Sequence, residues 1–216
     1  MTGRAGQTRR PMKKQNSRMG LLGAGILVLF AAAGIALTVT DEPTPEQTET
    51  AAVQIDGSTL PASPREPGDA DPAIGMAAPT ATGSDFAGRS VDLLNEDGGT
   101  VMVFLAHWCN VCRAEVPVIV DTLSPEALPD GVKLIGVPTS TNNGQPNYPP
   151  SAWLEREEWP FPVLVDSAEY DLGQAYGIGA FPAFVVVGPD GDVRFRAAGA
   201  LTPEQLDQVI DMAAQP

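Results

Sequence analysis

Apolar residues gather in short blocks from about residue 73 to the C-terminus, and their spacing alternates between that of strands and that of helices. Strand patterns cover residues 100–105, 132–137, 162–165, 183–187 and 193–198. Helical patterns between them begin near Cys109, Ser151 and Ala168. Because strands alternate with helices, the pattern predicts an α/β domain over residues 73–216, with a central mixed sheet flanked by helices on both faces.

The last strand pair and the helix after it carry clear boundary signals. Gly188-Pro189-Asp190-Gly191 stands between two strand patterns and predicts a tight hairpin turn. Thr202-Pro203-Glu204-Gln205 supplies an N-cap, a proline at the first helical position and the glutamine of a capping box. The signals predict a final helix that ends near Ala214.

One long apolar block, residues 19–40, does not belong to this alternation. At about 1.5 Å per residue it is long enough for one bilayer core of about 30 Å. Residues 1–18 carry six basic side chains and no acidic one, whereas Asp41 and Glu42 follow the block. This asymmetry predicts a basic cytoplasmic segment, a single transmembrane helix and an extracytoplasmic remainder at the cell membrane. A cleaved signal peptide is the alternative, because 31–33 resembles a cleavage site, and a secreted protein would result.

Residues 41–72 are rich in Pro, Thr, Glu, Gly and Ala and contain no aromatic residue. This composition predicts a disordered, acidic linker that lifts the domain off the membrane. Residues 41–216 carry 7 basic and 27 acidic side chains, which argues against a nucleic-acid partner.

The two cysteines of the chain, Cys109 and Cys112, stand directly after a strand pattern and at the start of a helical one. A helix N-terminus offers unpaired N–H groups and a positive dipole end, which stabilise a thiolate. Cys109 is therefore expected to attack first, and Cys112 to displace the partner from the mixed disulfide. The pair predicts a thiol-disulfide oxidoreductase whose Cys109–Cys112 disulfide takes the place of a bound cofactor.

Three other interpretations of the cysteine pair are weaker. A structural disulfide across so short a loop would contribute only about 2 kcal/mol. Zinc normally takes four Cys or His ligands, and this chain has a single histidine, His107, so no metal is expected. Inert buried thiols fit poorly with the turn and helix start around them.

The stretch Phe104-Leu-Ala-His-Trp-Cys-Asn-Val-Cys-Arg-Ala-Glu-Val-Pro117 resembles the active-site stretch of the thioredoxin superfamily, in particular of its membrane-anchored TlpA/ResA-like branch. The resemblance runs from about residue 74 to the C-terminus. It implies a thioredoxin-like three-layer fold with an extra strand and helix at about 132–166.

The resemblance also implies roles for single residues. Pro117 matches the proline that kinks the active-site helix by removing a backbone hydrogen bond. Pro182 matches the cis-proline beside the disulfide, which leaves the backbone of Phe181 free to pair with a substrate strand. Glu115 matches the glutamate that exchanges a proton with Cys112, and the alternative is an exposed helical acid without a role.

Three aromatic or imidazole side chains near the motif have open roles. Trp108 is expected either to shield the disulfide or to serve packing alone. Phe181 stands where smaller residues are common and is expected to narrow the substrate groove or alter the redox poise. His107 either favours the Cys109 thiolate as a protonated imidazole or is an exposed loop residue. The polar stretch 139–150 predicts a surface loop, either a partner contact or a plain insertion.

These expectations combine into a monomeric, membrane-tethered enzyme that exchanges electrons with cysteines of exported proteins and with a membrane electron donor or acceptor. The reductant direction, as in apocytochrome c maturation or thiol repair, is favoured by analogy with the branch. Oxidative disulfide formation is the first alternative. A copper-handling or partner-binding module that uses the same two sulfurs without turnover is the second.

Overall fold

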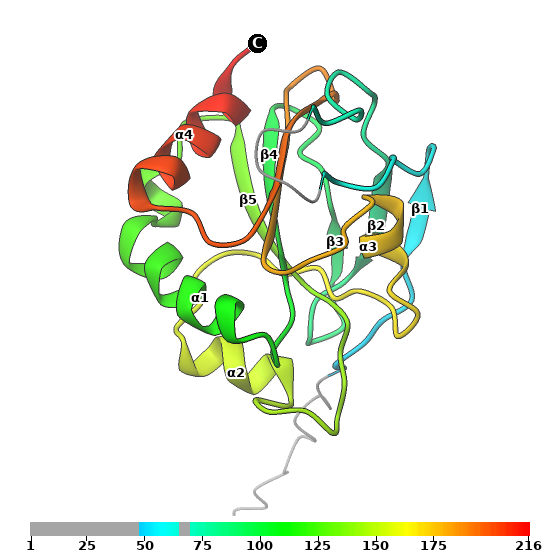
Figure 1. The fold of residues 1–216 in the computed structure, drawn as a ribbon, viewed down its shortest axis with the longest axis vertical. Coiled ribbons are helices and arrows are strands. Elements are labelled where there is room, and N and C mark those ends of the chain that lie inside the picture. Colours follow the sequence, from blue (N-terminus) through cyan, green and yellow to red (C-terminus); the bar gives the residue numbers. More distant parts are fainter. Residues whose placement is uncertain (1–47, 65–69) are drawn as a thin grey trace, which may run out of the picture. The chain divides into compact units, whose positions relative to one another are not determined.

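Four strands form the central sheet of the domain in the computed structural model, which describes residues 48–64 and 70–216 (Figure 1). They are β4 (Gly99–Leu105), β5 (Val132–Pro138), β6 (Ala183–Val187) and β7 (Val193–Ala198), in the order β5-β4-β6-β7. β4 runs parallel to β5 and antiparallel to β6, and β6 runs antiparallel to β7. The predicted mixed sheet is therefore confirmed, with its four strands within one or two residues of the predicted bounds.

Strand β4 lies at the centre because both of its faces are apolar. All seven of its residues are buried. Val101, Val103 and Leu105 belong to one hydrophobic cluster, whereas Met102 and Phe104 belong to the other. Since successive side chains of a strand point to opposite faces, β4 joins two cores, one on each side of the sheet.

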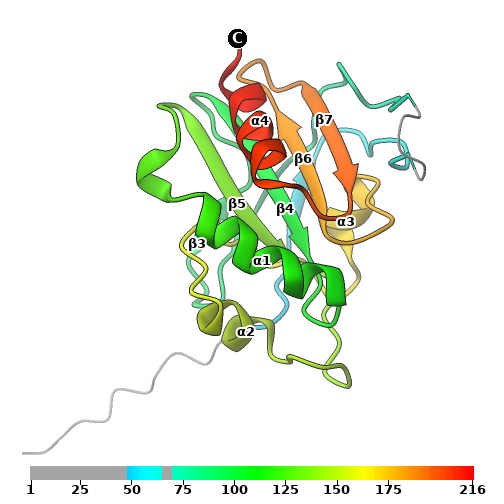
Figure 2. The same cartoon turned by 60° about the vertical axis from the view of Figure 1, so that its left-hand side comes forward.

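Three helices cover one face of the sheet. Figure 2 shows α1 (Asn110–Thr122) and α4 (Pro203–Ala214) side by side in front of the strands. The short helix α2 (Pro150–Arg156) contributes Trp153 and Leu154 to the same core. This face agrees with the predicted helical layer.

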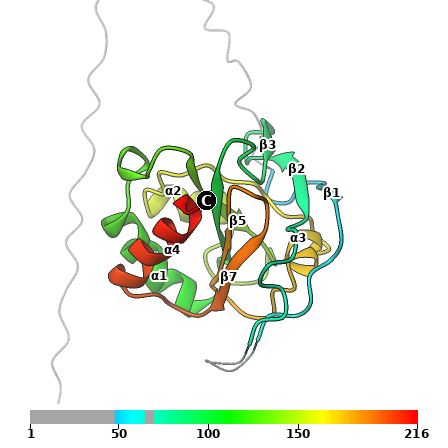
Figure 3. The same ribbon diagram turned by 90° about the horizontal axis from the view of Figure 1, so that it is seen from above.

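The opposite face is covered differently from the prediction of helices on both sides. A small antiparallel sheet of β1 (Gln54–Asp56), β2 (Thr80–Ser84) and β3 (Ser90–Asp92) lies there with the five-residue helix α3 (Asp171–Ala175) (Figure 3). The sequence pattern missed these strands because they are short and mostly polar, and Ala81 is the one buried residue in them.

One predicted strand is wrong. Residues 162–165 form no strand and make only an isolated bridge, Gly136 with Val163, beside β5. The Asp166 N–H also donates to the Pro138 carbonyl of β5 at 3.0 Å, but Pro138 and Pro162 have no N–H to donate, so the ladder along β5 stays incomplete. A 3₁₀ turn at Pro125–Ala127 completes the elements between α1 and β5.

Both boundary signals near the C-terminus are confirmed. The Gly188 N–H donates to the Asp192 carbonyl across the turn between β6 and β7 at 2.9 Å, and Gly191 has the positive φ of 82° that favours glycine. At the start of α4 the Gln205 N–H donates to Thr202 Oγ1 at 3.3 Å, while the Thr202 N–H donates to Gln205 Oε1 at 2.9 Å. The helix ends at Ala214, as predicted.

The prediction of a disordered linker over residues 41–72 is wrong for its described part, 48–64 and 70–72. β1 pairs with β2, and Leu60 is buried in the core. The Glu49 carboxylate accepts hydrogen bonds from the backbone N–H and the hydroxyl of Ser151 at the start of α2, at 3.0 and 2.5 Å. The segment is ordered because partners far along the chain pair with it, which composition does not reveal.

A buried ion pair fixes the end of this segment to the sheet. The Arg196 guanidinium of β7 donates to both carboxylate oxygens of Asp71, at 2.9 and 2.5 Å, and to the carbonyls of Pro61 and Tyr176. Burial alone would raise the pKa of Asp71, but the Arg196 side chain and the Ala73 N–H outweigh it and lower that pKa. Arg196 thus joins three parts of the chain at one point.

The predicted basic segment 1–18 and the predicted anchor or signal peptide 19–40 lie outside the described residues. Within 48–64 and 70–216, no helix combines the length and the apolar character needed to cross a bilayer.

Candidate functional site

The cysteine pair sits where β4 passes into α1. Cys109 is the N-cap of α1 and is partly exposed, whereas Cys112 lies in the first turn and is buried. Both are free thiols. The sequence therefore placed the pair correctly at the start of a helix, with one sulfur open to a partner and the other behind it.

The two thiols lie in unlike environments. The Cys109 thiol donates to the Phe181 carbonyl at 3.4 Å. Burial raises the pKa of the Cys112 thiol well above its usual range, and the neighbouring Cys109 adds to that rise. Cys112 is thus held as a thiol, which fits Cys109 as the predicted attacking group.

The Phe181–Pro182 peptide bond is cis, as predicted from the resemblance. The Phe181 ring meets two aromatic rings edge-on, that of Trp108 with centroids 6.0 Å apart and that of Tyr170 with centroids 5.9 Å apart. Tyr170 was missed by the sequence interpretation, because it precedes α3, more than fifty residues from the cysteines, and no motif marks it. Its hydroxyl donates to the Ile178 carbonyl at 2.7 Å, which holds the ring in place.

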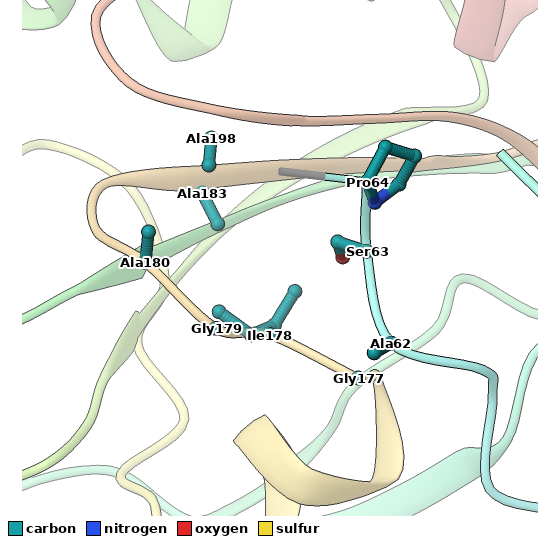
Figure 4. Close-up of a pocket in the computed structure, with 9 residues that line it drawn as sticks. All are labelled: Ala62, Ser63, Pro64, Gly177, Ile178, Gly179, Ala180, Ala183 and Ala198. Atoms are coloured by element: carbon teal, nitrogen blue, oxygen red, sulfur yellow. The ribbon is translucent and has the colours of Figure 1, made fainter. Parts of the chain in front are cut away.

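The segment that leads into Pro182 borders a cavity of about 280 Å³ (Figure 4). Residues 177–180 line one side of it, residues 62–64 line the other, and Ala183 and Ala198 come from β6 and β7. Six of the nine lining residues are glycine or alanine, so residues 179 and 180 carry little side-chain cover on the way into Phe181 and Pro182.

Glu115 is buried in α1, with 2% of its surface exposed, so the alternative of an exposed helical acid is wrong. Its Oε1 accepts the Leu201 N–H at 2.9 Å. Burial raises the pKa of this carboxyl, and the bond from Leu201 opposes the rise only in part. A buried carboxyl therefore stands one helical turn beyond Cys112.

Pro117 lies inside α1, as the resemblance implied. It has no N–H for the carbonyl of Arg113, so one bond of the helix ladder is missing next to Glu115. The predicted kink itself stays a prediction.

The predicted alternative of an exposed loop residue is wrong for His107. The side chain is 1% exposed rather than a surface group. Its Nε2 accepts the Asn142 N–H at 3.1 Å, so Nδ1 carries the proton and donates to the Pro146 carbonyl at 2.7 Å. The predicted effect of a protonated imidazole on the Cys109 thiolate stays a prediction. Because both ring nitrogens are bonded to residues of the 139–150 loop, the imidazole offers no free nitrogen to a metal ion.

Trp108 contacts the same loop. Its Nε1 donates to the Ser140 carbonyl at 2.8 Å, and the side chain is partly buried. The predicted surface loop at 139–150 is confirmed as irregular chain up to α2, and it adjoins the cysteine pair. In the part of the chain that the structure describes, no three His, Cys, Asp or Glu side chains group closely enough to hold a metal ion.

Comparison with known proteins agrees with this arrangement. The profile of the redoxin family matches residues 73–210. The chain belongs to the redoxin family. This redoxin is 30% identical over 140 residues to the thiol-disulfide oxidoreductase ResA of Geobacillus thermodenitrificans, an alignment that covers 64% of the chain and 77% of that relative. It is 26% identical over 121 residues to the sporulation thiol-disulfide oxidoreductase A of Bacillus subtilis, over 56% of the chain and 72% of that relative.

Solved structures show the same fold. The redoxin superposes on a thiol:disulfide interchange protein of Chlorobium tepidum with a TM-score of 0.53 at 21% identity, over 67% of this chain and 98% of the other. It superposes on the thioredoxin domain of a thiol-disulfide oxidoreductase of Bacteroides vulgatus with a TM-score of 0.53 at 24% identity, over 66% and 99%. The redoxin is a thioredoxin-like oxidoreductase of the TlpA/ResA-like branch, as the resemblance implied.

Proposed function

We propose that Cys109 and Cys112 form the reaction centre of a thiol-disulfide oxidoreductase that acts on cysteines of exported proteins. The observation that carries the proposal is the unequal placement of the two sulfurs. Cys109 is partly exposed at the N-cap of α1 beside the cis peptide of Pro182, whereas Cys112 is buried behind it. An attacking thiol must reach a large partner, and a resolving thiol needs only to reach its neighbour.

The reductive half of the reaction follows from this placement. The Cys109 thiolate attacks one sulfur of the client disulfide, forms a mixed disulfide and releases the other client sulfur as a thiolate, which takes up a proton. Cys112 then loses its proton and attacks Cys109 Sγ, and the second client sulfur leaves and is protonated. The client gains two electrons and two protons, and the enzyme holds a Cys109–Cys112 disulfide.

The resolving step needs a base, because burial keeps Cys112 protonated. Glu115 lies one helical turn further along α1, and its raised pKa makes its carboxylate a stronger base than a surface glutamate. We assign the proton of Cys112 to Glu115 in this step. The Phe181 carbonyl, which accepts from the Cys109 thiol in the free enzyme, becomes available to a client N–H once that thiol has reacted.

The basic segment 1–18 and the apolar block 19–40 support an extracytoplasmic domain tethered to the cell membrane. A secreted protein would result if the block were cleaved. The reductant direction rests on similarity to relatives named ResA, and it requires a membrane electron donor to restore the dithiol. An equilibrium potential of about −270 mV for the Cys109/Cys112 couple would fit a reductant, and a potential of about −120 mV would fit an oxidant.

Two serine variants test the reaction centre. Cys112→Ser should accumulate a mixed disulfide with a disulfide-containing polypeptide such as insulin, visible as a larger band on non-reducing gels, because the resolving sulfur is gone. Cys109→Ser should form none, although the buried Cys112 is still present. Equal trapping by both variants, or by neither, would contradict the assignment.

A further inference from the structure

The two residues before Cys109 hold a loop against the reaction centre. His107 receives the Asn142 N–H at Nε2 and donates from Nδ1 to the Pro146 carbonyl. The Asn147 side-chain amide donates to the His107 carbonyl at 3.1 Å, and Trp108 Nε1 donates to the Ser140 carbonyl. These bonds attach residues 140–147, called here the 140–147 loop, to the chain that ends in the N-cap cysteine.

The imidazole is well suited to this task because it is buried and satisfied on both nitrogens. Its partners are a backbone N–H and a backbone carbonyl four residues apart, so the bonds fix the shape of the loop and do not depend on the loop's side chains. The Tyr148 ring packs edge-on against the imidazole, with centroids 6.0 Å apart. A shorter side chain at position 107 would remove the partner of the Asn142 N–H and of the Pro146 carbonyl, so the loop would lose both attachments to the imidazole.

A cavity of about 240 Å³ opens between the loop and the aromatic residues of the site. Trp108 and Tyr170 line it from the side of the cysteines, and both rings touch Phe181, whose carbonyl accepts from Cys109. The rest of the lining carries no charge: Ser140, Thr141, Asn142, Gln145 and Ala168. The volume is below that of pockets for drug-sized ligands and is suited to a single side chain.

We propose that His107 is a positioning residue, and that the 140–147 loop it holds forms with Trp108 and Tyr170 a subsite for one uncharged side chain of the polypeptide client. The proposal rests on the proposed function. A client strand whose cysteine reacts with Cys109 extends past Trp108, and a residue near that cysteine places its side chain in the cavity. Aromatic faces and amide or hydroxyl groups suit an aromatic or neutral polar side chain, and a carboxylate or ammonium would find no counter-charge there.

The test compares a polypeptide disulfide with a small one. Reduced enzyme is mixed with insulin or with hydroxyethyl disulfide over a range of concentrations, and the half-saturating concentration and the maximal rate are measured separately. His107→Ala removes both hydrogen bonds of the ring to the loop. In this variant the ratio of maximal rate to half-saturating concentration for insulin, relative to the same ratio for hydroxyethyl disulfide, should fall about fivefold, which corresponds to about 1 kcal/mol. The fall in this ratio should come from a higher half-saturating concentration of insulin rather than from a lower maximal rate.

Two asparagines of the same stretch provide a matched pair. Asn147→Ala removes the bond to the His107 carbonyl and should shift the insulin ratio in the same direction. Asn143→Ala should leave it unchanged, since Asn143 is exposed, has no side-chain bond within 48–64 and 70–216 and does not line the cavity. Gln145→Ala changes an exposed lining residue, so it tests the subsite even if His107→Ala folds poorly. It too should raise the half-saturating concentration of insulin.

Each other outcome has a distinct meaning. Equal losses with insulin and hydroxyethyl disulfide in His107→Ala would overturn the subsite and place the effect on the thiol. An unchanged ratio in both His107→Ala and Gln145→Ala would also overturn it. If the wild-type enzyme reduced neither disulfide, the proposed function itself would fail. This result is distinct from failure of the subsite, which is measured only in the variants.

Discussion

At the scale of single residues, the site contains two buried ionisable groups on one helix. Cys112 and Glu115 are three positions apart in α1, and burial raises the pKa of each. A charge on either is therefore disfavoured in the folded state. A transfer of the Cys112 proton to the Glu115 carboxylate would leave the net charge of these two buried groups unchanged.

The raised pKa of Glu115 predicts a pH-dependent cost in stability. The folded protein holds the Glu115 proton more tightly than the unfolded chain, whose glutamates titrate near about 4.3. The stabilisation is therefore complete below that value and is lost as pH rises through the folded pKa. Glu115→Gln lacks this titration but keeps an oxygen for the Leu201 N–H, so its free energy of unfolding should rise relative to wild type above about pH 4.3. Urea unfolding at a series of pH values measures the difference, and parallel curves would contradict it.

The same variant tests the proton transfer. If Glu115 takes the proton of Cys112, Glu115→Gln should slow closure of the Cys109–Cys112 disulfide from a mixed disulfide by about 10²-fold or more. Formation of the mixed disulfide should change much less. Stopped-flow measurement of the two steps separates them, and unchanged closure would remove Glu115 from the mechanism.

At the scale of elements, the start of α4 is tied to the active-site helix. Glu115 of α1 accepts the Leu201 N–H, and Thr202 is the N-cap of α4. Two polar side chains thus fix the position where α4 begins. The packing of Leu206, Val209 and Ile210 against the sheet follows from that start.

Removing the cap should weaken the protein modestly. Thr202→Ala deletes the oxygen that receives the Gln205 N–H and should cost about 1 kcal/mol of unfolding free energy. Thr202→Ser keeps that oxygen and is the matched control. Urea unfolding at neutral pH measures both, and an equal loss in the serine variant would show that the threonine methyl group, rather than the cap, matters.

At the scale of the whole molecule, residues before the redoxin match belong to the folded domain. The match begins at residue 73, yet Asp71 lies before it and pairs with Arg196, whose side chain is fully buried. Glu49 and β1 attach the same segment to α2 and β2. Glu49, β1 and Asp71 therefore attach the chain before residue 73 to the folded domain at three places.

Breaking the buried pair should cost far more than breaking a surface one. Asp71→Asn leaves the Arg196 guanidinium buried without its counter-charge and should lower the unfolding free energy by about 3–5 kcal/mol. Asp56→Asn, an exposed aspartate in the same segment, is the control and should change it little. Because the pKa of Asp71 is lowered, its contribution is present above the unfolded value near about 3.9 and is lost as pH falls through the folded pKa. Equal losses in the two variants at pH 7 would contradict the role of the ion pair.

Local signals in the sequence determined the order of strands and helices from β4 to α4, apart from the wrongly predicted strand at 162–165. They also determined the cysteine pair at the start of α1 and the capped helix at the end. The Gly188–Gly191 turn and the Thr202 cap depend on neighbours a few residues away, so the sequence carries them in full. The cis bond before Pro182 followed from the resemblance.

Tertiary structure alone decided which polar residues are buried and what they bind. Glu115 meets Leu201, Arg196 meets Asp71 and His107 meets Asn142, pairs separated by 86, 125 and 35 positions. The composition of residues 41–72 predicted a linker, and the loop position of His107 suggested an exposed side chain. Both expectations failed because composition and loop position carry no information on contacts with distant parts of the chain. Burial raises the pKa of Glu115, and the Asn142 N–H determines which nitrogen of His107 carries the proton. The environment of the site therefore came from packing rather than from the order of its residues.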